Sequence, residues 1–321
     1  MAKNAEVTVI IPNYNGKKLL ENCIKTLEQQ TCLLFETMIV DNGSTDGSTE
    51  LCSDILDIHW IKLKENTGFC GAVNCGIRHT GTPYFILLNN DTEADTHFVE
   101  ELLSAIKKSD RIFSCGAQML DFHRHDRIDN AGDYYTALGW AVPRGKGKPK
   151  EKFSVEKDVF SCCGGASIYR TDAVRKIGDF DETHFAYLED VDIGYRARIQ
   201  GYRNRYVPTA WVYHVGSATT GTRYNERKVF LAARNSRFLL YKNMPLLQLI
   251  LNLPLILVGV LVKWLFFLRK GFAGEYMKGI REGIKERHAC RKVRFSWAHL
   301  GHYVRIQLEL WLNIIRVIVS L

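Results

Sequence analysis

Short apolar runs alternate with amphipathic segments through the first half of the chain, and each run stops at a cluster of polar turn residues. Apolar residues recur at helical spacing over 19–27 and again over 72–77. Alternating strands and helices predict an α/β fold with a mostly parallel central sheet flanked by helices. Loops after the strands then share one crevice. The expected strands are 7–11, 35–40, 59–63, 84–88 and 205–215.

Acidic residues stand where three of the apolar segments end. Asp41 lies in VDNGSTDGS, Asp91 lies in LLNNDT, and Glu189 with Asp190 lies in YLEDVDIGYR. In an α/β sheet, residues at these strand ends contact a ligand rather than the core. The three turns therefore indicate an enzyme, with Asp41 and Asp91 on the same rim.

Two common nucleotide-binding loops are missing from the sequence. It contains neither G-x-G-x-x-G nor G-x-x-x-x-G-K-[ST]. Hydride transfer with a dinucleotide and phosphoryl transfer on a P-loop therefore lose their main support.

Several motifs, in this order, resemble the inverting family-two glycosyltransferases of the GT-A fold. The downstream AARNSRFLLYKNMP also resembles the branch that transfers deoxyhexoses such as rhamnose in bacterial surface-polysaccharide assembly. The resemblance runs from Val7 to about Thr219, and its specificity comes from the order and spacing of the motifs. The motifs are IIPNYNG, VDNGSTDGS, ENTGFCGAVNCGI, LLNNDT, CCGGASIYR, FAYLEDVDIGYRAR and VYHVGSAT.

The resemblance implies a divalent cation, Mg²⁺ or Mn²⁺, because a leaving nucleoside diphosphate gains negative charge. Family members carry two acids around one residue after the fourth strand, where this chain has Asn89, Asn90 and Asp91. Asp91 is then the expected metal ligand. Asn89 departs from the pattern and could bind the cation or a ribose hydroxyl only as a neutral dipole. The alternative for this segment is an Asx-turn.

His214, in VYHVGSAT, is the other metal candidate. In the family, a histidine here often completes the metal shell or contacts the diphosphate, and neutral imidazole is a suitable ligand. A histidine with a purely structural role is the alternative.

Inversion at the anomeric carbon requires one base, opposite the leaving group, to accept the proton of the incoming hydroxyl. The resemblance assigns this role to Asp190, with Glu189 beside it on the acceptor side. Two adjacent carboxylates in a partly dry pocket raise one another's proton affinity. In a helix, Asp192 points away from Asp190 and caps the helix or pairs with Arg196. The alternative for the acidic pair is the first turn of an exposed helix.

The resemblance also implies which residues bind the nucleotide. Pro12, Asn13 and Asn15 form the floor under base and ribose, and Asp41 accepts from N3–H of uracil or thymine. A carboxylate suits that donor, so UDP or dTDP is favoured over a purine nucleotide. The remaining candidates near the ribose and diphosphate are Asn66, Gly68, Asn89 and Asn90.

The acceptor loop is expected at 161–166, where Gly164 and Gly165 follow two cysteines. The cysteine pair has no second pair or histidine at zinc spacing, so a metal role is rejected. The span 118–157 is the least regular part of this half and carries Trp140, which could stack on a sugar. It is expected either to cover the cleft as an acceptor-side lid or to be a flexible solvated insertion.

The domain boundary is predicted at 240, with a catalytic domain at 1–240 and a basic, helical, membrane-associated region at 241–321. From 263 onward there are 12 Lys and Arg against four Glu, so this tail holds the whole net charge of +8. A nucleic-acid partner is rejected because an apolar stretch at 246–262, broken by Pro254, precedes the basic residues. An interfacial or re-entrant segment is favoured over a full crossing.

The final segment is predicted to be a helix with one narrow polar stripe. Membrane attachment to anionic headgroups is favoured, and burial in a core or in a homodimer interface is the alternative. The stripe consists of Arg305, Glu309, Asn313, Arg316 and Ser320.

Nine scattered cysteines suggest reduced thiols, and the opening MAKNAEV shows no signal peptide. The expected location is the cytoplasmic face of a bacterial membrane, with a lipid-linked glycan or polysaccharide as acceptor. Two further hypotheses remain: a sugar nucleotidyltransferase, and a non-catalytic partner subunit with the same fold. The absence of a glycine-rich, lysine-bearing N-terminal loop disfavours the first.

Overall fold

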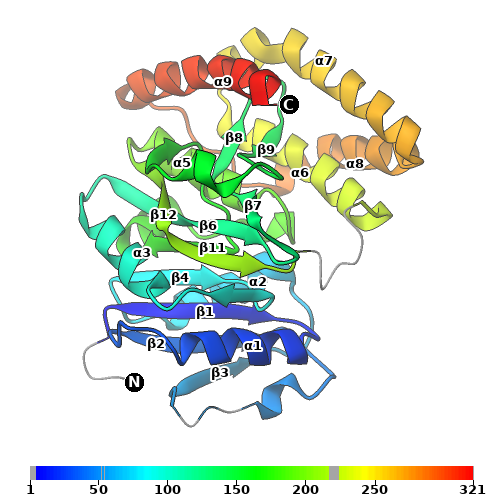
Figure 1. Ribbon diagram of the computed structural model, residues 1–321. Helices are drawn as coiled ribbons and strands as arrows, with labels where there is room; N and C mark the ends of the chain where they lie inside the picture. The colour runs from blue at the N-terminus through cyan, green and yellow to red at the C-terminus, as the bar shows by residue number, and fades with distance from the viewer. Residues whose placement is uncertain (1–4, 52, 54, 217–223, 321) are drawn as a thin grey trace.

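The computed structural model describes residues 5–51, 53, 55–216 and 224–320. Its centre is a ten-stranded sheet with the order β10-β12-β6-β11-β4-β1-β2-β3, to which β5 adds beside β12 and β7 beside β6 (Figure 1). The strands are β1 (Val7–Asn13), β2 (Phe35–Asp41), β3 (Ile58–Lys62), β4 (Tyr84–Leu88), β5 (Thr92–Ala94), β6 (Ile112–Asp121), β7 (Arg124–Asn130), β10 (Lys157–Val159), β11 (Ala166–Arg170) and β12 (Arg203–His214).

The sheet is mixed but mostly parallel, as predicted. Strands β1 to β4 run parallel, with Val9 of β1 opposite Thr37 of β2 and Ile86 of β4. Strand β11 is antiparallel to both β4 and β6, whereas β6 and β12 run parallel. The predicted strands are all present, with ends that differ by at most a few residues.

Helices cover both faces of the sheet (Figure 1). A small separate sheet pairs β8 (Asp133–Tyr135) with β9 (Ala141–Pro143). The helices are α1 (Lys17–Leu27), α2 (Gly68–His79), α3 (Phe98–Lys107), α4 (Thr171–Ile177), α5 (Glu189–Ile199), α6 (Glu226–Asn243), α7 (Leu246–Lys270), α8 (Ala273–Lys285) and α9 (Leu300–Ser320), and the short 3₁₀ turns are η1 (Ser48–Glu50), η2 (Lys150–Phe153), η3 (Glu182–His184), η4 (Arg287–Ala289) and η5 (Trp297–His299).

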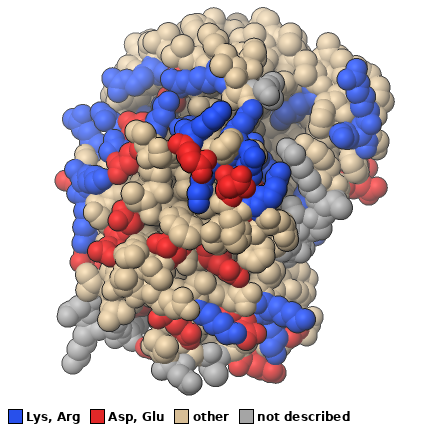
Figure 2. All heavy atoms as spheres, in the orientation of Figure 1, with Lys and Arg blue, Asp and Glu red and all other residues tan. Residues whose placement is uncertain are grey.

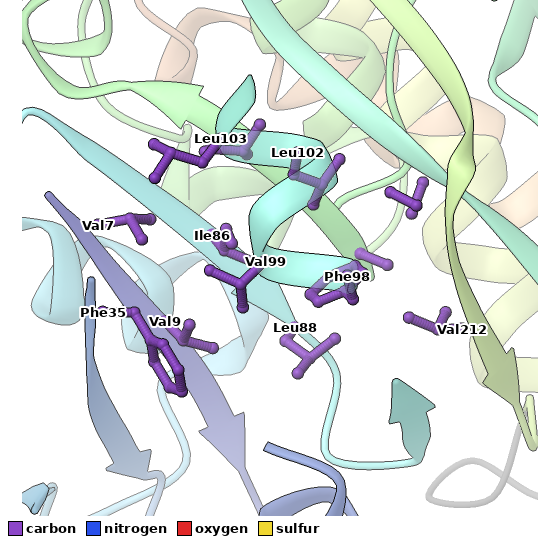
Figure 3. Packing of buried hydrophobic residues seen from close by; sticks show 14 of the residues in the cluster. Val7, Val9, Phe35, Ile86, Leu88, Phe98, Val99, Leu102, Leu103 and Val212 are labelled. Carbon is purple, nitrogen blue, oxygen red and sulfur yellow. The ribbon is translucent and has the colours of Figure 1, made fainter. Parts of the chain in front are cut away.

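Burial on both faces explains why the strand sequences are continuously apolar. Val9 of β1 packs in the cluster that contains Phe98 and Leu102 of α3 (Figure 3). Its neighbour Ile10 points the other way, into a cluster with Val73 of α2. Successive strand side chains alternate between faces, so a strand with helices on both sides needs apolar residues at every position.

The C-terminal helices share a core with the part of the chain before residue 240. One buried cluster combines Tyr195 of α5, Leu239 of α6, Ile256 of α7 and Leu310 of α9. The predicted boundary after residue 240 falls in the last turn of α6. Helices α6 and α8 pack closely, because a Cβ on Gly283 would lie 2.5 Å from the carbonyl oxygen of Arg234.

The span 118–157 forms regular secondary structure, unlike the flexible insertion that was one alternative, and its role as an acceptor-side lid stays a prediction. It contains the end of β6, all of β7 and the β8–β9 hairpin. The hairpin is fixed to α9, since Asn313 Nδ2 donates to the carbonyl of Tyr135 at 2.9 Å. Contacts with a helix distant in sequence thus order a segment whose own pattern shows no period.

Helices α7 and α9 bury several polar residues against the protein and leave rows of apolar residues exposed. On α7, Gln248 and Asn252 are buried, whereas Leu257 and Leu261 are 61% and 53% exposed. Asn252 exchanges two 2.8 Å hydrogen bonds with Gln307 of α9. So many exposed leucines are unusual for a helix that packs on a core in water.

The described part of the chain has one helix, α7, whose length and composition would suit a membrane crossing. The expected break at Pro254 does not occur, because α7 is continuous from Leu246 to Lys270, and how this segment meets a membrane stays a prediction. The predicted polar stripe of α9 is partly inward: Asn313 is buried, and Glu309 pairs with Arg198 of α5.

Candidate active site

Three predicted nucleotide residues form one hydrogen-bonded chain at the ends of β1, β2 and β4. Asn90 Nδ2 donates to Asn13 Oδ1 at 2.7 Å, and Asn13 Nδ2 donates to Asp41 Oδ1 at 3.1 Å. The side chain of Asn90 lies so close to the backbone at Gly16 that only glycine fits there, because a Cβ would lie 2.2 Å from Asn90 Nδ2. Parallel neighbours therefore bring their terminal polar side chains together, as the sequence predicted.

The loop after β2 is folded against the end of β1. Pro12 is opposite Val40 in the sheet, and the N–H of Asn15 donates to Ser44 Oγ at 2.9 Å. Asp41 Oδ2 accepts from the N–H of Ser44 at 3.0 Å. Each Asp41 oxygen thus accepts one internal bond and keeps lone pairs for a further donor.

Asn42 connects this loop to the turn that contains Asn66 and Gly68. Its Nδ2 group donates to Asn66 Oδ1 at 3.1 Å and to the Gly68 carbonyl at 3.0 Å. Gly68 has φ +78°, and a Cβ there would lie 2.6 Å from the ring of Phe185. Sequence reasoning missed Asn42, although it follows Asp41 within the same motif.

The predicted acceptor loop links Asn89 to Asp190. The N–H of Asn89 donates to the Gly165 carbonyl at 2.8 Å, and a Cβ on Gly165 would lie 2.9 Å from Asn89 Nδ2. The N–H of neighbouring Gly164 donates to Asp190 Oδ2 at 3.3 Å. The structure therefore joins turns from Asp41 to Asp190 through consecutive contacts.

Asp190 and Glu189 begin α5 in unequal surroundings. Asp190 Oδ1 also accepts from the N–H of Val191 at 2.7 Å, whereas Glu189 Oε2 is buried without a hydrogen-bond partner in the described structure. Burial, with the charge of Asp190, raises the pKa of Glu189 to about 8. Burial also raises the pKa of Asp190, against the two N–H donors that favour its charged form.

A third buried carboxyl, Asp133 of β8, lies in the same electrostatic cluster. Burial and the charge of Asp190 raise its pKa well above the ordinary value. Asp133 accepts from Asn130 Nδ2 at 2.9 Å and from Ser161 Oγ at 3.5 Å. Asp133 could not be found from the sequence, because the span around it has no strand or helix periodicity.

Asp91 immediately precedes β5 and His214 ends β12, and the pairing of these two strands brings the two side chains face to face. Asp91 Oδ1 lies 3.3 Å from His214 Nε2, and Asp129 Oδ2 lies 2.8 Å from His214 Nδ1. Burial opposes protonation, but bonds to Asp129 and Asp91 outweigh it and raise the pKa of His214 to about 9. Asp129 was missed by sequence reasoning for the same reason as Asp133.

Within residues 5–51, 53, 55–216 and 224–320, no three His, Cys, Asp or Glu side chains form a ready cluster for a metal ion. The pair Asp91 and His214 offers one oxygen and one nitrogen ligand. The motif VYHVGSAT continues to residues 217–219, which lie outside the described residues.

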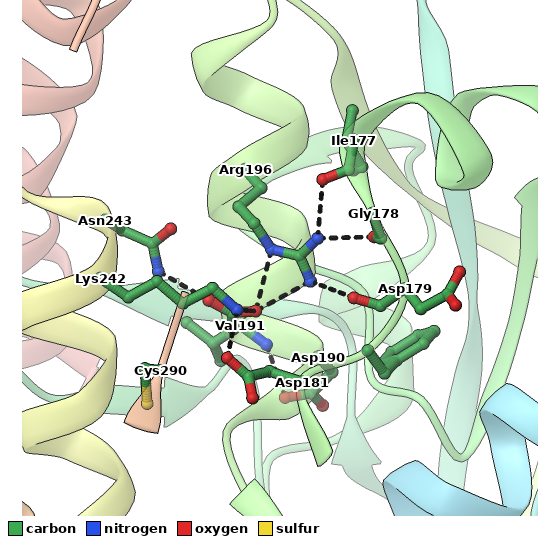
Figure 4. Close-up of polar contacts among 12 residues, drawn as sticks. Ile177, Gly178, Asp179, Asp181, Asp190, Val191, Arg196, Lys242, Asn243 and Cys290 are labelled. Atoms are coloured by element: carbon green, nitrogen blue, oxygen red, sulfur yellow. Dashed lines mark hydrogen bonds and ion pairs between the residues drawn. The ribbon is translucent and has the colours of Figure 1, made fainter. Parts of the chain in front are cut away.

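The pairing of Asp192 with Arg196 is confirmed, within a larger buried network (Figure 4). Asp192 Oδ2 lies 2.8 Å from Arg196 Nη2 and 2.9 Å from Lys242 Nζ, and its Oδ1 accepts from Asn243 Nδ2 at 2.8 Å. These groups hold the pKa of Asp192 far below its usual range despite burial. The network ties α5 to the end of α6.

Trp140 lies against α7. Its indole N–H donates to the carbonyl of Gly259 at 3.1 Å, and Lys263 Nζ is 5.5 Å from the ring centroid. One polar atom and one face of the ring are thus occupied by α7. Its role toward an acceptor stays a prediction.

Comparison with known proteins agrees with this geometry. The model of "Glycosyl transferase family 2" matches residues 8–178. This match and the GT-A type of fold define the class of protein as a transferase. The chain belongs to glycosyl transferase family 2 and is a glycosyltransferase.

Two bacterial relatives illustrate the family. The N-acetylglucosaminyl-diphospho-decaprenol L-rhamnosyltransferase of Mycobacterium tuberculosis is 24% identical over 71% of this chain and 84% of its own length. The teichoic acid poly(glycerol phosphate) polymerase of Staphylococcus epidermidis is 29% identical over 34% of this chain. The chain spans only 16% of that polymerase.

Solved structures share the fold. S. aureus TarS 1–349 in complex with UDP-GlcNAc has a TM-score of 0.55 at 14% identity, over 91% of this chain and 94% of its own. The mannosyltransferase PcManGT from Pyrobaculum calidifontis, in complex with GDP-Man and Mn²⁺, has a TM-score of 0.54 at 13% identity, over 89% and 88%. These likenesses support the GT-A type of fold.

Proposed function

We propose that this protein is an inverting, metal-dependent glycosyltransferase that moves a sugar from UDP or dTDP to a membrane-linked glycan in bacterial surface-polysaccharide assembly. Asp190 is the base, and rhamnose is the sugar favoured by the similarity to a rhamnosyltransferase. The observation that carries the proposal is the contact between Asp190 and the Gly164–Gly165 loop, whose other side contacts Asn89.

Unequal hydrogen bonding favours Asp190 over Glu189 as the base. Asp190 receives two backbone N–H donors, which stabilise a carboxylate, whereas Glu189 has a buried oxygen with no partner in the described structure. A proton shared by the pair at neutral pH therefore resides on Glu189. Asp190 stays anionic and can accept the proton of an incoming hydroxyl.

Asp91 and His214 fit a divalent cation that also binds the donor. Without a cation, Asp129 and Asp91 raise the pKa of His214 to about 9 and favour its protonated form. A bound cation would replace the proton on Nε2, so that Nδ1–H stays toward Asp129 while the Nε2 lone pair and Asp91 both face the cation, as in many metal-binding histidines. Such a cation neutralises charge on the departing diphosphate. With two ligands from the protein, the remaining ones come from the diphosphate and water, and Asn89 adds at most a neutral oxygen.

The donor proposal rests on Asp41 and the turns around it. The Asp41 carboxylate keeps free lone pairs for the N3–H of uracil or thymine, and Asn13, Asn90, Asn66 and Gly68 surround the ribose and diphosphate.

A panel of UDP-, dTDP- and GDP-sugars, each with and without Mg²⁺ or Mn²⁺, tests this function. Release of nucleoside diphosphate from a pyrimidine donor, dependent on the metal, is the expected result. Release of pyrophosphate from a nucleoside triphosphate would instead identify a nucleotidyltransferase. Absence of turnover with every donor, in the presence of lipid-linked acceptors, would support the non-catalytic alternative.

A membrane surface is the proposed partner of the apolar faces of α7 and α9. In Figure 2 the top of the molecule, where both helices lie in Figure 1, is mostly tan, with Lys and Arg gathered beneath it. Gln248 accepts a hydrogen bond from Tyr195 of α5, Asn252 bonds to Gln307 of α9, and the Gly259 carbonyl accepts from Trp140, so α7 is attached to the protein at several turns rather than projecting from it. Exposed leucines above cationic residues suit an anionic bilayer interface.

Sedimentation with vesicles tests this partner. The full chain is expected to bind phosphatidylcholine vesicles more tightly when phosphatidylglycerol is included. The double variant Leu257→Glu/Leu261→Glu should lose binding, and Val155→Glu, at an equally exposed apolar residue of the catalytic half, should retain it. A stable dimer by light scattering that disappears in the double variant, without vesicle binding by the wild type, would identify a homodimer interface instead.

A further inference from the structure

The segment before the proposed base follows a left-handed path that its residues disfavour. Phe185, Tyr187 and Leu188 have φ of +61°, +75° and +68°. A Cβ makes this conformation unfavourable, and three such residues in four positions require outside support. Leu188 is the N-cap of α5, so the path determines how the helix starts and where Asp190 stands.

Asn235, in the middle of α6, provides that support. Its side-chain amide nitrogen lies 2.9, 2.8 and 2.8 Å from the carbonyl oxygens of His184, Ala186 and Tyr187. The residue is completely buried, so its amide has little alternative hydration when it bonds to those carbonyls. Its own Oδ1 accepts from Arg234 Nε at 3.1 Å, which fixes the orientation of the amide.

The fourth carbonyl of the segment points to the donor side. The carbonyl oxygen of Phe185 accepts from the N–H of Cys70 at 3.2 Å, and the Phe185 ring lies against Gly68. The positive φ values at Phe185, Tyr187 and Leu188 thus accompany a path in which the Phe185 carbonyl faces α2 and three other carbonyls face α6. The segment connects the proposed nucleotide turn with the proposed base, and Asn235 holds it from the opposite side.

We propose that Asn235 is a positioning residue that maintains the left-handed 185–188 segment and thereby aligns Asp190 with the donor turn at Gly68. The proposal rests on the proposed function for its kinetic consequence, but its structural part stands independently. Alanine has no donor for the three carbonyls. The His184 carbonyl keeps Arg234 Nη2 at 3.2 Å, but the Ala186 and Tyr187 carbonyls lose the side-chain donor that holds them, so this part of the segment is free to relax toward right-handed conformations.

Asn252→Ala is a matched control. Asn252 is also a completely buried asparagine in a C-terminal helix, and its partners are Gln248 and Gln307, distant in sequence from the 185–188 segment. Both variants lose a buried amide, so a general loss of stability affects both. Only Asn235→Ala should change the segment before α5.

Hydrogen exchange tests the structural part without any substrate. In Asn235→Ala, exchange of the amides at 184–191 is expected to accelerate by roughly tenfold relative to the wild type, because a buried donor is lost. Exchange there should be unchanged in Asn252→Ala. Equal protection of these amides in the wild type and in Asn235→Ala would overturn the proposal, whatever the enzyme's substrates are.

Kinetics test the alignment of the base. With the donor that the wild type uses, kcat of Asn235→Ala should fall by about tenfold or more while the dissociation constant of the nucleoside diphosphate changes by less than about threefold. Adding Leu188→Gly should restore part of kcat, since glycine adopts the left-handed conformation without support. A role in packing alone predicts a further loss in that double variant and would contradict the proposal. A wild type without turnover would count against the proposed function, and the exchange result would still decide the role of Asn235.

Discussion

The backbone N–H of Gly164 donates to Oδ2 of Asp190 at 3.3 Å, so the glycine loop and the proposed base are in direct contact. Helix α5 carries the Asp190 carboxylate, and the loop before β11 carries the backbone N–H that donates the hydrogen bond to it. A hydroxyl bound at this loop would therefore lie beside the group that removes its proton.

Asp190→Asn is expected to abolish transfer while leaving donor binding intact. An amide can accept one backbone N–H but cannot take a proton from the acceptor hydroxyl, so kcat should fall by about a thousandfold. The dissociation constant of the donor should change by less than about threefold, because the nucleotide turns are elsewhere. Steady-state kinetics with calorimetry of donor binding measures both. Undiminished turnover in the variant would exclude Asp190 as the base.

Glu189 is expected to make stability depend on pH. Its pKa is raised from 4.5 to about 8 by burial and by Asp190, so the folded state binds more protons than the unfolded state between these values. Stability then falls as the pH rises from about 4.5 to 8, by on the order of a few kcal/mol. Glu189→Gln removes this contribution and should flatten the dependence, leaving the parts due to Asp190, Asp133 and His214, whose pKa values are also raised. Urea unfolding at pH 5 and pH 8.5 measures the change, and an unaltered slope in Glu189→Gln would refute it.

Gly68→Ala should damage both stability and donor binding. The new Cβ would lie 2.6 Å from the ring and from the carbonyl oxygen of Phe185, and φ is +78°. Gly147→Ala is the control, because φ is +77° there and nothing lies within 4 Å of the added Cβ. The control isolates the backbone strain, about 1 kcal/mol. A larger loss of stability and a weaker affinity for nucleotide are expected only for Gly68→Ala, and equal losses in both variants would show that the Phe185 contact is dispensable.

Local sequence pattern was sufficient for the strands and for the turns at Asp41 and Asp91. A strand buried on both faces needs an uninterrupted apolar run, and the polar residue that ends it lies on the rim of the sheet. These features depend on neighbours in sequence, so they could be predicted from the chain alone.

Residues whose partners are distant in sequence could not be found in this way. Asp129 is placed beside His214 by the pairing of β7, β6 and β12, and Asn235 reaches carbonyls about fifty positions earlier. The periodicity of α9 predicted its helix, but Asn313 faces inward because it meets a carbonyl of the β8–β9 hairpin. The spacing of apolar residues predicts which face of a helix is buried on average. A single polar residue can still be buried on that face when it makes a specific hydrogen bond there.

Lys242→Met should destabilise the fold strongly, because Asp192 and Asp181 would remain buried with one cation fewer. Lys242 Nζ lies 2.9 Å from Asp192 Oδ2 and 2.6 Å from Asp181 Oδ2. Removing one partner of a buried charge network costs on the order of 3–5 kcal/mol, since the remaining charges lose their compensation. Lys25→Met is the control: Lys25 pairs with Glu21 on the exposed face of α1, where solvent screens the interaction. Denaturant unfolding at neutral pH should show a large decrease of the midpoint for Lys242→Met and none for Lys25→Met. A midpoint equal to that of the wild type for Lys242→Met would mean that Arg196 and Asn243 alone are enough to hold Asp192.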